Sequence, residues 1–162
     1  MIEYFKADPW KVIEEGFNPD MNEIAESVFS LGNGMMGQRG NLEESYSGHS
    51  LQGTYVGGVY YPDKTRVGWW KNGYPEYFAK VLNATYWSGL RIWINGELLD
   101  LAKVEVLDFY RELDMHQGVL NRNCRVKLQN GIELHIQSCR FYSLINKEYS
   151  RAAAYCHCIS CE

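Results

Sequence analysis

The chain has 162 residues and a formal charge of −4, a length that suits one domain with a substantial core. A small negative charge disfavours nucleic acid as a partner, and the lack of any apolar run of roughly 18–20 residues disfavours a membrane. Five cysteines, three of them crowded in the run CHCISC, do not form the spaced pairs of a disulfide framework, and no signal-peptide pattern opens the chain, so we expect a cytoplasmic protein.

The first predicted element follows Asp8 and Pro9, which precede the stretch WKVIEE. Asp8 is suited to cap a helix and Pro9 to occupy its first position, so we expect a turn or two of helix from Trp10 to Glu15. Glycine, tyrosine and tryptophan are abundant in the rest of the chain, and this composition favours strands and turns over further helices.

Residues 32–40 read GNGMMGQRG and contain G-x-G-x-x-G, the spacing of a dinucleotide-binding loop. Such a loop requires a helix directly after the glycines, because the pyrophosphate binds at the N-terminus of that helix. The residues that follow, NLEESYSGHSLQGTY, carry no apolar stripe at helical spacing. We therefore interpret the segment as a glycine-rich β-loop.

This loop has two interpretations. Its glycines can permit positive φ angles and a close approach of neighbouring strands. Alternatively, the constrained loop presents polar side chains to a ligand, and its arginine suits a carboxylate, a phosphate or a contact with another domain. The candidate site residues of the loop are Asn33, Gly34, Gln38, Arg39 and Gly40.

A run rich in aromatic residues, WWKNGYPEYF, extends from Trp69 to Phe78. Trp and Tyr faces can stack on pyranose rings, so the candidates for sugar stacking are Trp69, Trp70, Tyr74 and Tyr77. The alternative, which we favour, is that the run packs on the fold or on another domain.

Two hairpins are predicted, each around an Asn-Gly dipeptide that suits the positive φ angles of a type I′ turn. In LRIWINGELLDL, apolar and polar residues alternate on both sides of Asn95-Gly96. In RVKLQNGIELHIQS, they alternate on both sides of Asn130-Gly131. Alternation with a period of two indicates half-buried antiparallel strands.

Other short segments are bounded by turn residues and read as further strands: Gly53 to Tyr60, Lys103 to Tyr110, Arg140 to Leu144 and Ala152 to Ile159. Many short strands with closely spaced turns indicate a sandwich or a barrel. We predict an all-β fold, an antiparallel β-sandwich that occupies residues 1–162 as one domain.

Neighbouring carboxylates occur at Glu14-Glu15, at Glu43-Glu44 and at Glu112 with Asp114. Adjacent strand residues point to opposite faces and most such pairs lie on the solvated surface, so we expect these carboxylates there, without a catalytic role. The Cys and His side chains of CHCISC also divide between the two faces of a strand, and we expect a buried strand there in preference to a zinc site.

Four ordered segments resemble those of glycoside hydrolase family 65, which includes maltose, trehalose and kojibiose phosphorylases. ESVFSLGNGMMGQRGNLEE is similar to the family pattern ES-x-F-x-LGNG-x-x-G-x-RG-x-x-EE, and GTYVGGVYY, INGELLDL and YRELDMHQGVLNR follow in the family's order. The likeness extends from about Trp10 to about Arg151. The chain departs from the family pattern at VLNATYW, where the family often has V-N-L-P-x-W, and at His116, where a basic residue is common.

The resemblance implies a longer parent protein, with an N-terminal supersandwich-like domain followed by a helical (α/α)₆ catalytic barrel. This chain would be an incomplete N-terminal portion with no catalytic residues, no cofactor and no metal. Its implied partners are the barrel and, in the parent, an α-linked glucose disaccharide with inorganic phosphate as co-substrate; a related hydrolase and an independent carbohydrate-binding module are the alternatives. Unpaired strand edges further predict a homodimer or edge-paired self-association.

Overall fold

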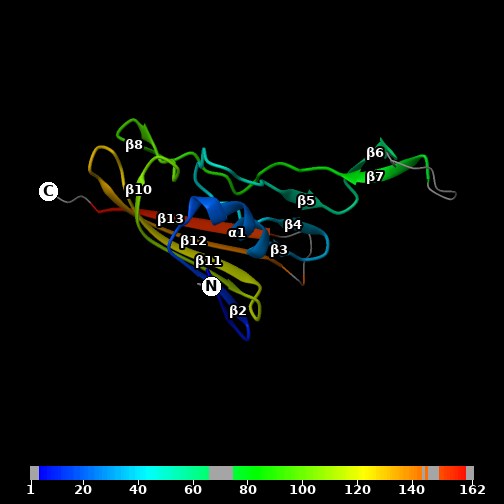
Figure 1. Ribbon diagram of the computed structural model, residues 1–162, viewed down its shortest axis with the longest axis horizontal. Coiled ribbons are helices and arrows are strands. Elements are labelled where there is room, and N and C mark those ends of the chain that lie inside the picture. The colour runs from blue at the N-terminus through cyan, green and yellow to red at the C-terminus, as the bar shows by residue number, and fades with distance from the viewer. Residues whose placement is uncertain (1–3, 66–74, 144, 146–149, 160–162) are drawn as a thin grey trace.

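A computed structural model describes residues 4–65, 75–143, 145 and 150–159, the last range by its backbone. The described part of the chain consists mainly of antiparallel strands in two layers (Figure 1), as an all-β sandwich requires. The elements are β1 (Phe5–Asp8), β2 (Lys11–Glu15), η1 (Pro19–Met21), α1 (Asn22–Val28), β3 (Leu31–Gly32), β4 (Met36–Gln38), β5 (Thr54–Val56), β6 (Tyr60–Lys64), β7 (Tyr77–Val81), β8 (Trp93–Ile94), β9 (Glu97–Leu98), β10 (Glu105–Asp114), β11 (Val119–Lys127), β12 (Glu133–Tyr142) and β13 (Ser150–Ile159).

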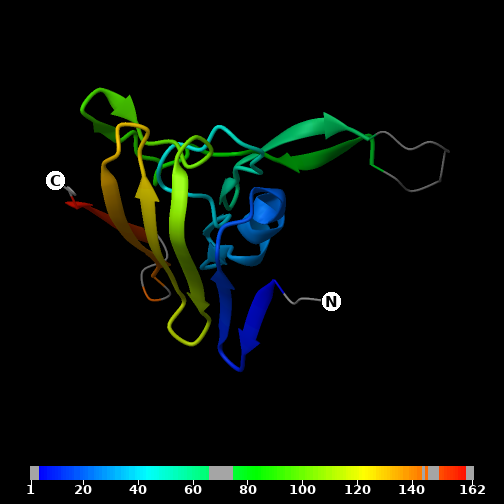
Figure 2. The same cartoon turned by 60° about the vertical axis from the view of Figure 1, so that its left-hand side comes forward.

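One layer is a six-stranded sheet in the order β1-β2-β10-β11-β12-β13. The four long strands β10 to β13 follow one another in sequence as a meander, and the N-terminal hairpin β1–β2 pairs with the second half of β10 (Figure 2). Every pairing is antiparallel, so residues directly opposite each other lie on the same face of the sheet.

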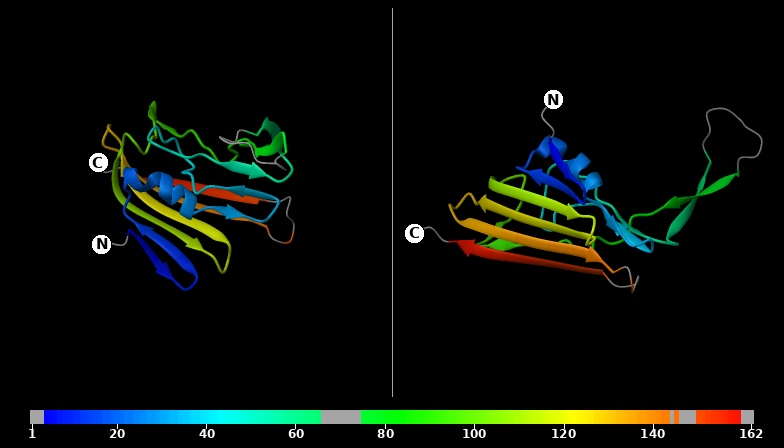
Figure 3. Two further views of the ribbon diagram at one scale, coloured as in Figure 1. Left: turned by 45° about the vertical axis from the view of Figure 1, so that its right-hand side comes forward. Right: turned by 90° about the horizontal axis from the view of Figure 1, so that it is seen from below.

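The other layer is less regular and covers one face of this sheet. It contains α1, the three-stranded sheet β3-β4-β5 and the small hairpin β8–β9, while the hairpin β6–β7 extends away from the body of the domain (Figures 1 and 2). The view from below in Figure 3 shows the opposite face of the long strands, and no described element crosses it.

The two Asn-Gly hairpins form as predicted, but with different turns. Asn95 and Gly96 have φ angles of 50° and 83° and join β8 to β9 as a two-residue type I′ turn. In the second hairpin only Gly131 has a positive φ, 88°, and the Leu128 N–H donates to the Ile132 carbonyl across three loop residues. The type I′ prediction is therefore wrong for Asn130-Gly131, where a type I turn is followed by a left-handed glycine.

The predicted helix from Trp10 to Glu15 is wrong, because Lys11–Glu15 is strand β2. Asp8 does not cap a helix; its Oδ1 accepts from the Trp10 N–H within the β1–β2 turn. Pairing with β1 on one side and β10 on the other satisfies the backbone of β2, and this long-range pairing outweighs the local capping signal.

The helix that does form, α1, was not predicted. It follows the 3₁₀ turn η1, which begins with the local signal of an Asn N-cap, Asn18, before Pro19. Ala25 and Phe29, four residues apart, are fully buried on the sheet side of this segment. Their spacing is the sequence signal that locates the helix.

The remaining strand predictions are largely confirmed, with changed bounds. β13 matches the segment predicted from Ala152, whereas the segment from Arg140 is the end of the long strand β12. Gly53 to Tyr60 contains β5 and the start of β6. The strand predicted from Lys103 is longer than expected, because β10 continues to Asp114 against β2 and β11.

The core consists of two apolar clusters separated by buried charge. The large cluster contains Leu42, Leu99, Leu101, Phe109, Cys124, Val126, Leu128, Leu134 and Ile136, and the small one contains Ala25, Phe29, Leu113 and Leu120. Between them, a row of residues directly opposite one another crosses four strands, from Glu14 through Arg111 and Arg122 to Ser138. All four side chains are buried.

Candidate functional site

The glycine-rich segment forms a tight antiparallel hairpin, β3–β4, in which Gly32 lies opposite Gly37. A Cβ on Gly32 would lie 3.2 Å from the Met36 carbonyl oxygen and 3.4 Å from the Gly37 Cα, so the two backbones approach closely and a side chain here would require the neighbouring strand to shift slightly. Strand β4 then pairs with β5, and no helix follows the glycines. The rejection of a dinucleotide-binding loop is confirmed, as is the close approach of strands.

Two of the predicted site residues, Asn33 and Gln38, point into the domain. Asn33 Oδ1 accepts from the N–H groups of Met35 and Met36, which closes the β3–β4 turn, and its Nδ2 donates to the Ser143 carbonyl. Gln38 is almost fully buried, and its Nε2 lies 2.9 Å from Ser88 Oγ. Both side-chain amides therefore form hydrogen bonds within the domain and do not face a ligand.

The other three residues of this loop differ in exposure. Gly34 is exposed with a φ of 85°, and Gly40 is buried against Phe29. The Arg39 guanidinium is half-buried, and its Nη1 donates to Ser27 Oγ at 2.6 Å. Arg39 also lines a pocket of about 380 Å³ with Ser27, Ser30, Leu31, Gly37, Gln38 and Tyr55. Arg39 is therefore the predicted polar residue that remains available at the surface.

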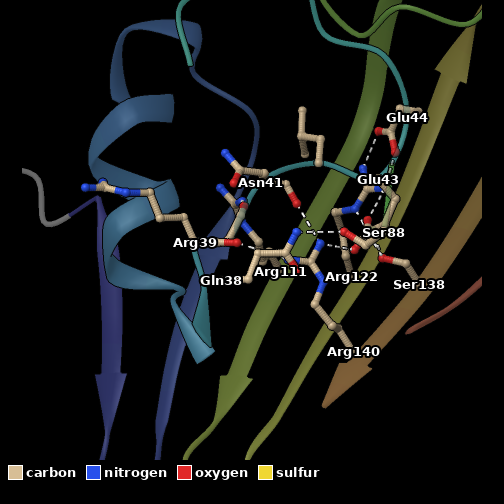
Figure 4. Close-up of polar contacts among 12 residues, drawn as sticks. Gln38, Arg39, Asn41, Glu43, Glu44, Ser88, Arg111, Arg122, Ser138 and Arg140 are labelled. Carbon is tan, nitrogen blue, oxygen red and sulfur yellow. Dashed lines mark hydrogen bonds and ion pairs between the residues drawn. The ribbon is translucent and has the colours of Figure 1, made fainter. Parts of the chain in front are cut away.

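Directly after this hairpin, residues 39–44 (RGNLEE) lie across the inner face of the long strands, where three arginines hold them (Figure 4). Arg111 of β10 donates to the Gly40 carbonyl at 2.7 Å. Arg140 of β12 donates to the carbonyls of Arg39 and Asn41, at 3.0 and 2.7 Å. We call this segment the clamped segment.

The carboxylates of the clamped segment complete the network. Arg122 of the central strand β11 binds both Glu44, with Nη1 2.5 Å from Oε1, and Glu43, with Nη2 3.0 Å from Oε2. Glu43 also accepts from Ser138 at 2.9 Å and pairs with Arg140. Burial alone would raise the pKa of Glu43, but Arg122 and Arg140 outweigh it and lower that pKa to about 2.

The expectation that the paired carboxylates lie on the solvated surface is wrong for Glu14, Glu43, Glu44 and Asp114, which are all buried; the three glutamates are also paired with arginine. The alternation rule failed because residues 41–44 are not a strand but a covering segment, so both neighbouring glutamates can point inward. The signal in the sequence was the presence of arginines at inward positions of three apolar strands, since a buried arginine needs an anionic partner.

The arrangement suits rigid positioning more than proton transfer. A general acid needs a pKa raised toward neutral pH, whereas Glu43 is ionised over the whole physiological range. Glu112 is half-buried on the other face of β10 and binds Lys11 at 3.0 Å. Asp114 accepts from the Gln117 N–H and caps the turn that follows β10.

Of the four aromatic candidates for sugar stacking, one lies within the described residues. Tyr77 stands at the start of β7, opposite Lys64, and is 54% exposed. Trp69, Trp70 and Tyr74 lie outside the described residues. Sugar stacking by this group stays a prediction.

Within the described ranges, no group of three or more His, Cys, Asp or Glu side chains could hold a metal ion. The side chains of Cys156, His157 and Cys158 and the whole of Cys161 fall outside that description. None of the described helices is long and apolar enough to span a membrane.

The two-layer fold is that of the N-terminal β-sandwich domain of disaccharide phosphorylases. A solved structure described as a kojibiose phosphorylase from the human microbiome superposes on 96% of this chain with a TM-score of 0.85 at 30% identity, and the chain covers 20% of it. The model of the "Glycosyl hydrolase family 65, N-terminal domain" matches residues 12–154. The chain belongs to glycosyl hydrolase family 65 and contains its N-terminal domain, as the sequence motifs indicated.

Individual relatives agree with this assignment. The chain is 50% identical over 144 residues to the maltose phosphorylase of Bacillus subtilis (strain 168), a match that covers 89% of this chain and 19% of the relative. It is 34% identical to a kojibiose phosphorylase of Caldanaerobacter subterraneus (87% of the chain, 17% of the relative) and 32% identical to the α,α-trehalose phosphorylase of Thermoanaerobacter brockii (91% and 19%). The chain thus spans about a fifth of the length of these relatives.

Proposed function

We propose that residues 1–162 form the non-catalytic N-terminal sandwich of a disaccharide phosphorylase that acts on α-linked glucosides. The observation that carries the proposal is the 50% identity to a maltose phosphorylase, maintained over 89% of the chain. The buried glutamates support the non-catalytic role, because each is bound by arginine or by hydrogen-bond donors inside the domain.

In the parent enzyme, inverting phosphorolysis needs one carboxylic acid to protonate the glycosidic oxygen while phosphate attacks the anomeric carbon from the opposite face. The product from an α-glucoside is β-glucose 1-phosphate. We assign this chemistry to an (α/α)₆ barrel outside residues 1–162. Inorganic phosphate is then a co-substrate, and the domain itself needs no cofactor.

The role proposed for this domain is to brace the barrel and to form part of the rim of its active site. The three-arginine network supports this role, since it holds the backbone of the clamped segment from inside, directly after the β3–β4 hairpin. The exposed Gly34 of that hairpin and the half-buried Arg39 directly after it are the residues suited to contact the barrel or a substrate.

The test is an assay of the full-length protein on maltose, trehalose and kojibiose, with and without phosphate. The expected result is phosphate-dependent release of glucose and of β-glucose 1-phosphate, with the anomer identified by NMR, from one of the three sugars. The isolated 162-residue chain should show no turnover. Phosphate-independent release of glucose would identify a hydrolase instead, and turnover by the isolated chain would contradict the non-catalytic role.

We also propose that the protein works in the cytoplasm and that the isolated chain self-associates. Strand β13 is ten residues long and pairs only with β12 in the described structure, so one backbone edge is open to a second copy. Light scattering should therefore give a mass that rises with concentration. A monomer at all concentrations would contradict edge pairing.

A further inference from the structure

The outer face of the six-stranded sheet, turned away from α1 and the clamped segment, carries a group of polar side chains that neither the core nor the proposed bracing role uses. They lie in two adjacent cross-strand rows on β10, β11 and β12: Glu112–Asn121–Cys139 and Tyr110–Asn123–Gln137. These six residues line a pocket of about 470 Å³, to which Arg122 and Ser138 of the intervening row also contribute. We call it the outer-face pocket.

The charges of the outer-face pocket are already neutralised. Glu112 accepts from Lys11 Nζ at 3.0 Å and from the Tyr110 hydroxyl at 2.7 Å, which occupies both of its carboxylate oxygens. Glu15, the register partner of Tyr110 on β2, is paired with Lys6. Because each acid has a basic partner, the pocket favours a neutral ligand over an anion or a cation.

Its amides keep hydrogen-bonding capacity. Asn123 uses its oxygen toward His135 Nε2, and its amino group has no partner within the described part of the chain. Among the described residues, the side chains of Asn121 and Gln137 make no hydrogen bond, and each offers both a donor and an acceptor. Asn121 and Gln137 are diagonal neighbours on two paired strands. Because the sheet fixes their positions, their amide groups are held in place before a ligand binds.

A polyhydroxylated sugar matches this set of groups. Hydroxyl groups donate and accept at once, as side-chain amides do, and the half-buried Tyr110 ring adds an apolar surface beside them for the C–H face of a pyranose. We propose that the outer-face pocket is a non-catalytic binding site for a neutral α-glucan oligosaccharide. The choice of an α-linked glucan rests on the proposed function, whereas the site itself lies on the face of the sheet opposite the clamped segment and takes no part in the proposed catalysis.

The test is a titration of the ¹⁵N-labelled chain with maltoheptaose, followed through the side-chain NH₂ signals of Asn121, Asn123 and Gln137. Binding is expected to shift these signals in a saturable way, while those of Asn22 and Gln38, which are buried in the covering layer, stay in place. An equal concentration of cellohexaose tests whether the α-linkage matters. Unmoved outer-face signals at saturating sugar would overturn the proposal even if the protein binds elsewhere.

Variants provide the second readout by affinity electrophoresis in gels containing soluble starch. The double variant N121A/Q137A is expected to weaken retardation by about tenfold or more, since it removes two hydrogen-bonding side chains. Gln129→Ala, an exposed glutamine in the loop between β11 and β12, is the matched control and should migrate as wild type. A loss of retardation in Tyr77→Ala with none in N121A/Q137A would move sugar binding to the aromatic run and contradict the outer-face site.

Discussion

Glu14 of β2 and Arg111 of β10 lie directly opposite each other in the sheet, with Glu14 Oε2 2.6 Å from Arg111 Nη2 and both side chains almost fully buried. This ion pair joins the N-terminal hairpin to the meander. Through its second contact, to the Gly40 carbonyl, Arg111 also ties both to the clamped segment. The guanidinium of Arg111 thus connects three parts of the chain that are far apart in sequence.

The first prediction concerns this pair. Glu14→Ala leaves the Arg111 charge buried without its anion, and we expect a loss of about 3–5 kcal/mol in the free energy of unfolding. Glu15→Ala, the neighbour whose exposed carboxylate pairs with Lys6, should cost less than about 1 kcal/mol. Urea unfolding followed by circular dichroism measures both. Equal losses in the two variants would show that the buried pair is not a major stabilising contact.

The second prediction is a pH dependence. The folded state lowers the pKa of Glu43 from 4.5 to about 2, so its stabilising effect is complete above about pH 4.5 and is lost as the pH falls toward 2. A shift of this size corresponds to about 3 kcal/mol. Glu43→Gln should therefore be less stable than wild type at pH 6, and the difference should shrink steadily below pH 4.5.

The control for this experiment is Glu105→Gln, which changes an exposed carboxylate at the start of β10. Urea midpoints from pH 2 to pH 7 are the measurement. If the difference in urea midpoint between the wild type and Glu43→Gln stayed constant across this pH range, the assignment of the acid-sensitive contact to Glu43 would be wrong.

The third prediction separates two glycines of the family signature. A Cβ at Gly40 would lie 2.6 Å from the Phe29 Cβ and 2.9 Å from its carbonyl oxygen, so Gly40→Ala should destabilise by about 1–3 kcal/mol. Trimming the ring in Phe29→Leu should not relieve this loss, because the contact is with Cβ and backbone. Gly34 has open space around it and a positive φ, so Gly34→Asn should cost less than Gly40→Ala. Thermal unfolding ranks the variants, and rescue by Phe29→Leu would contradict the stated contact.

The fourth prediction compares the two hairpins. Asn95 has a φ of 50°, which β-carbon sterics disfavour for most residues, so Asn95→Ala should cost about 1 kcal/mol and Asn95→Gly should be tolerated. Asn130 does not have a positive φ; its side chain accepts from the Ile132 N–H, so Asn130→Gly should be worse tolerated than Asn95→Gly. Chemical unfolding of the three variants tests whether the same Asn→Gly change is tolerated in one Asn-Gly dipeptide and destabilising in the other.

Local sequence patterns determined the class of fold and many of its strands. Alternation with a period of two and the Asn-Gly turns predicted antiparallel hairpins, because both signals act between residues that are neighbours in the chain. The glycine spacing predicted close backbone approach, which Gly32 and Gly37 confirm. The family followed from four ordered motifs, whereas any one of them would have been weak.

Only the tertiary structure decided which partners the charged residues bind and whether WKVIEE forms a helix or a strand. Glu14, Glu43 and Glu44 meet Arg111, Arg122 and Arg140 across sequence separations of 78 to 97 residues. No local pattern encodes such a meeting, because it depends on how the covering layer lies on the sheet. The same holds for β2, which reads as a capped helix in isolation and becomes a strand because β10 supplies the hydrogen bonds that its backbone needs.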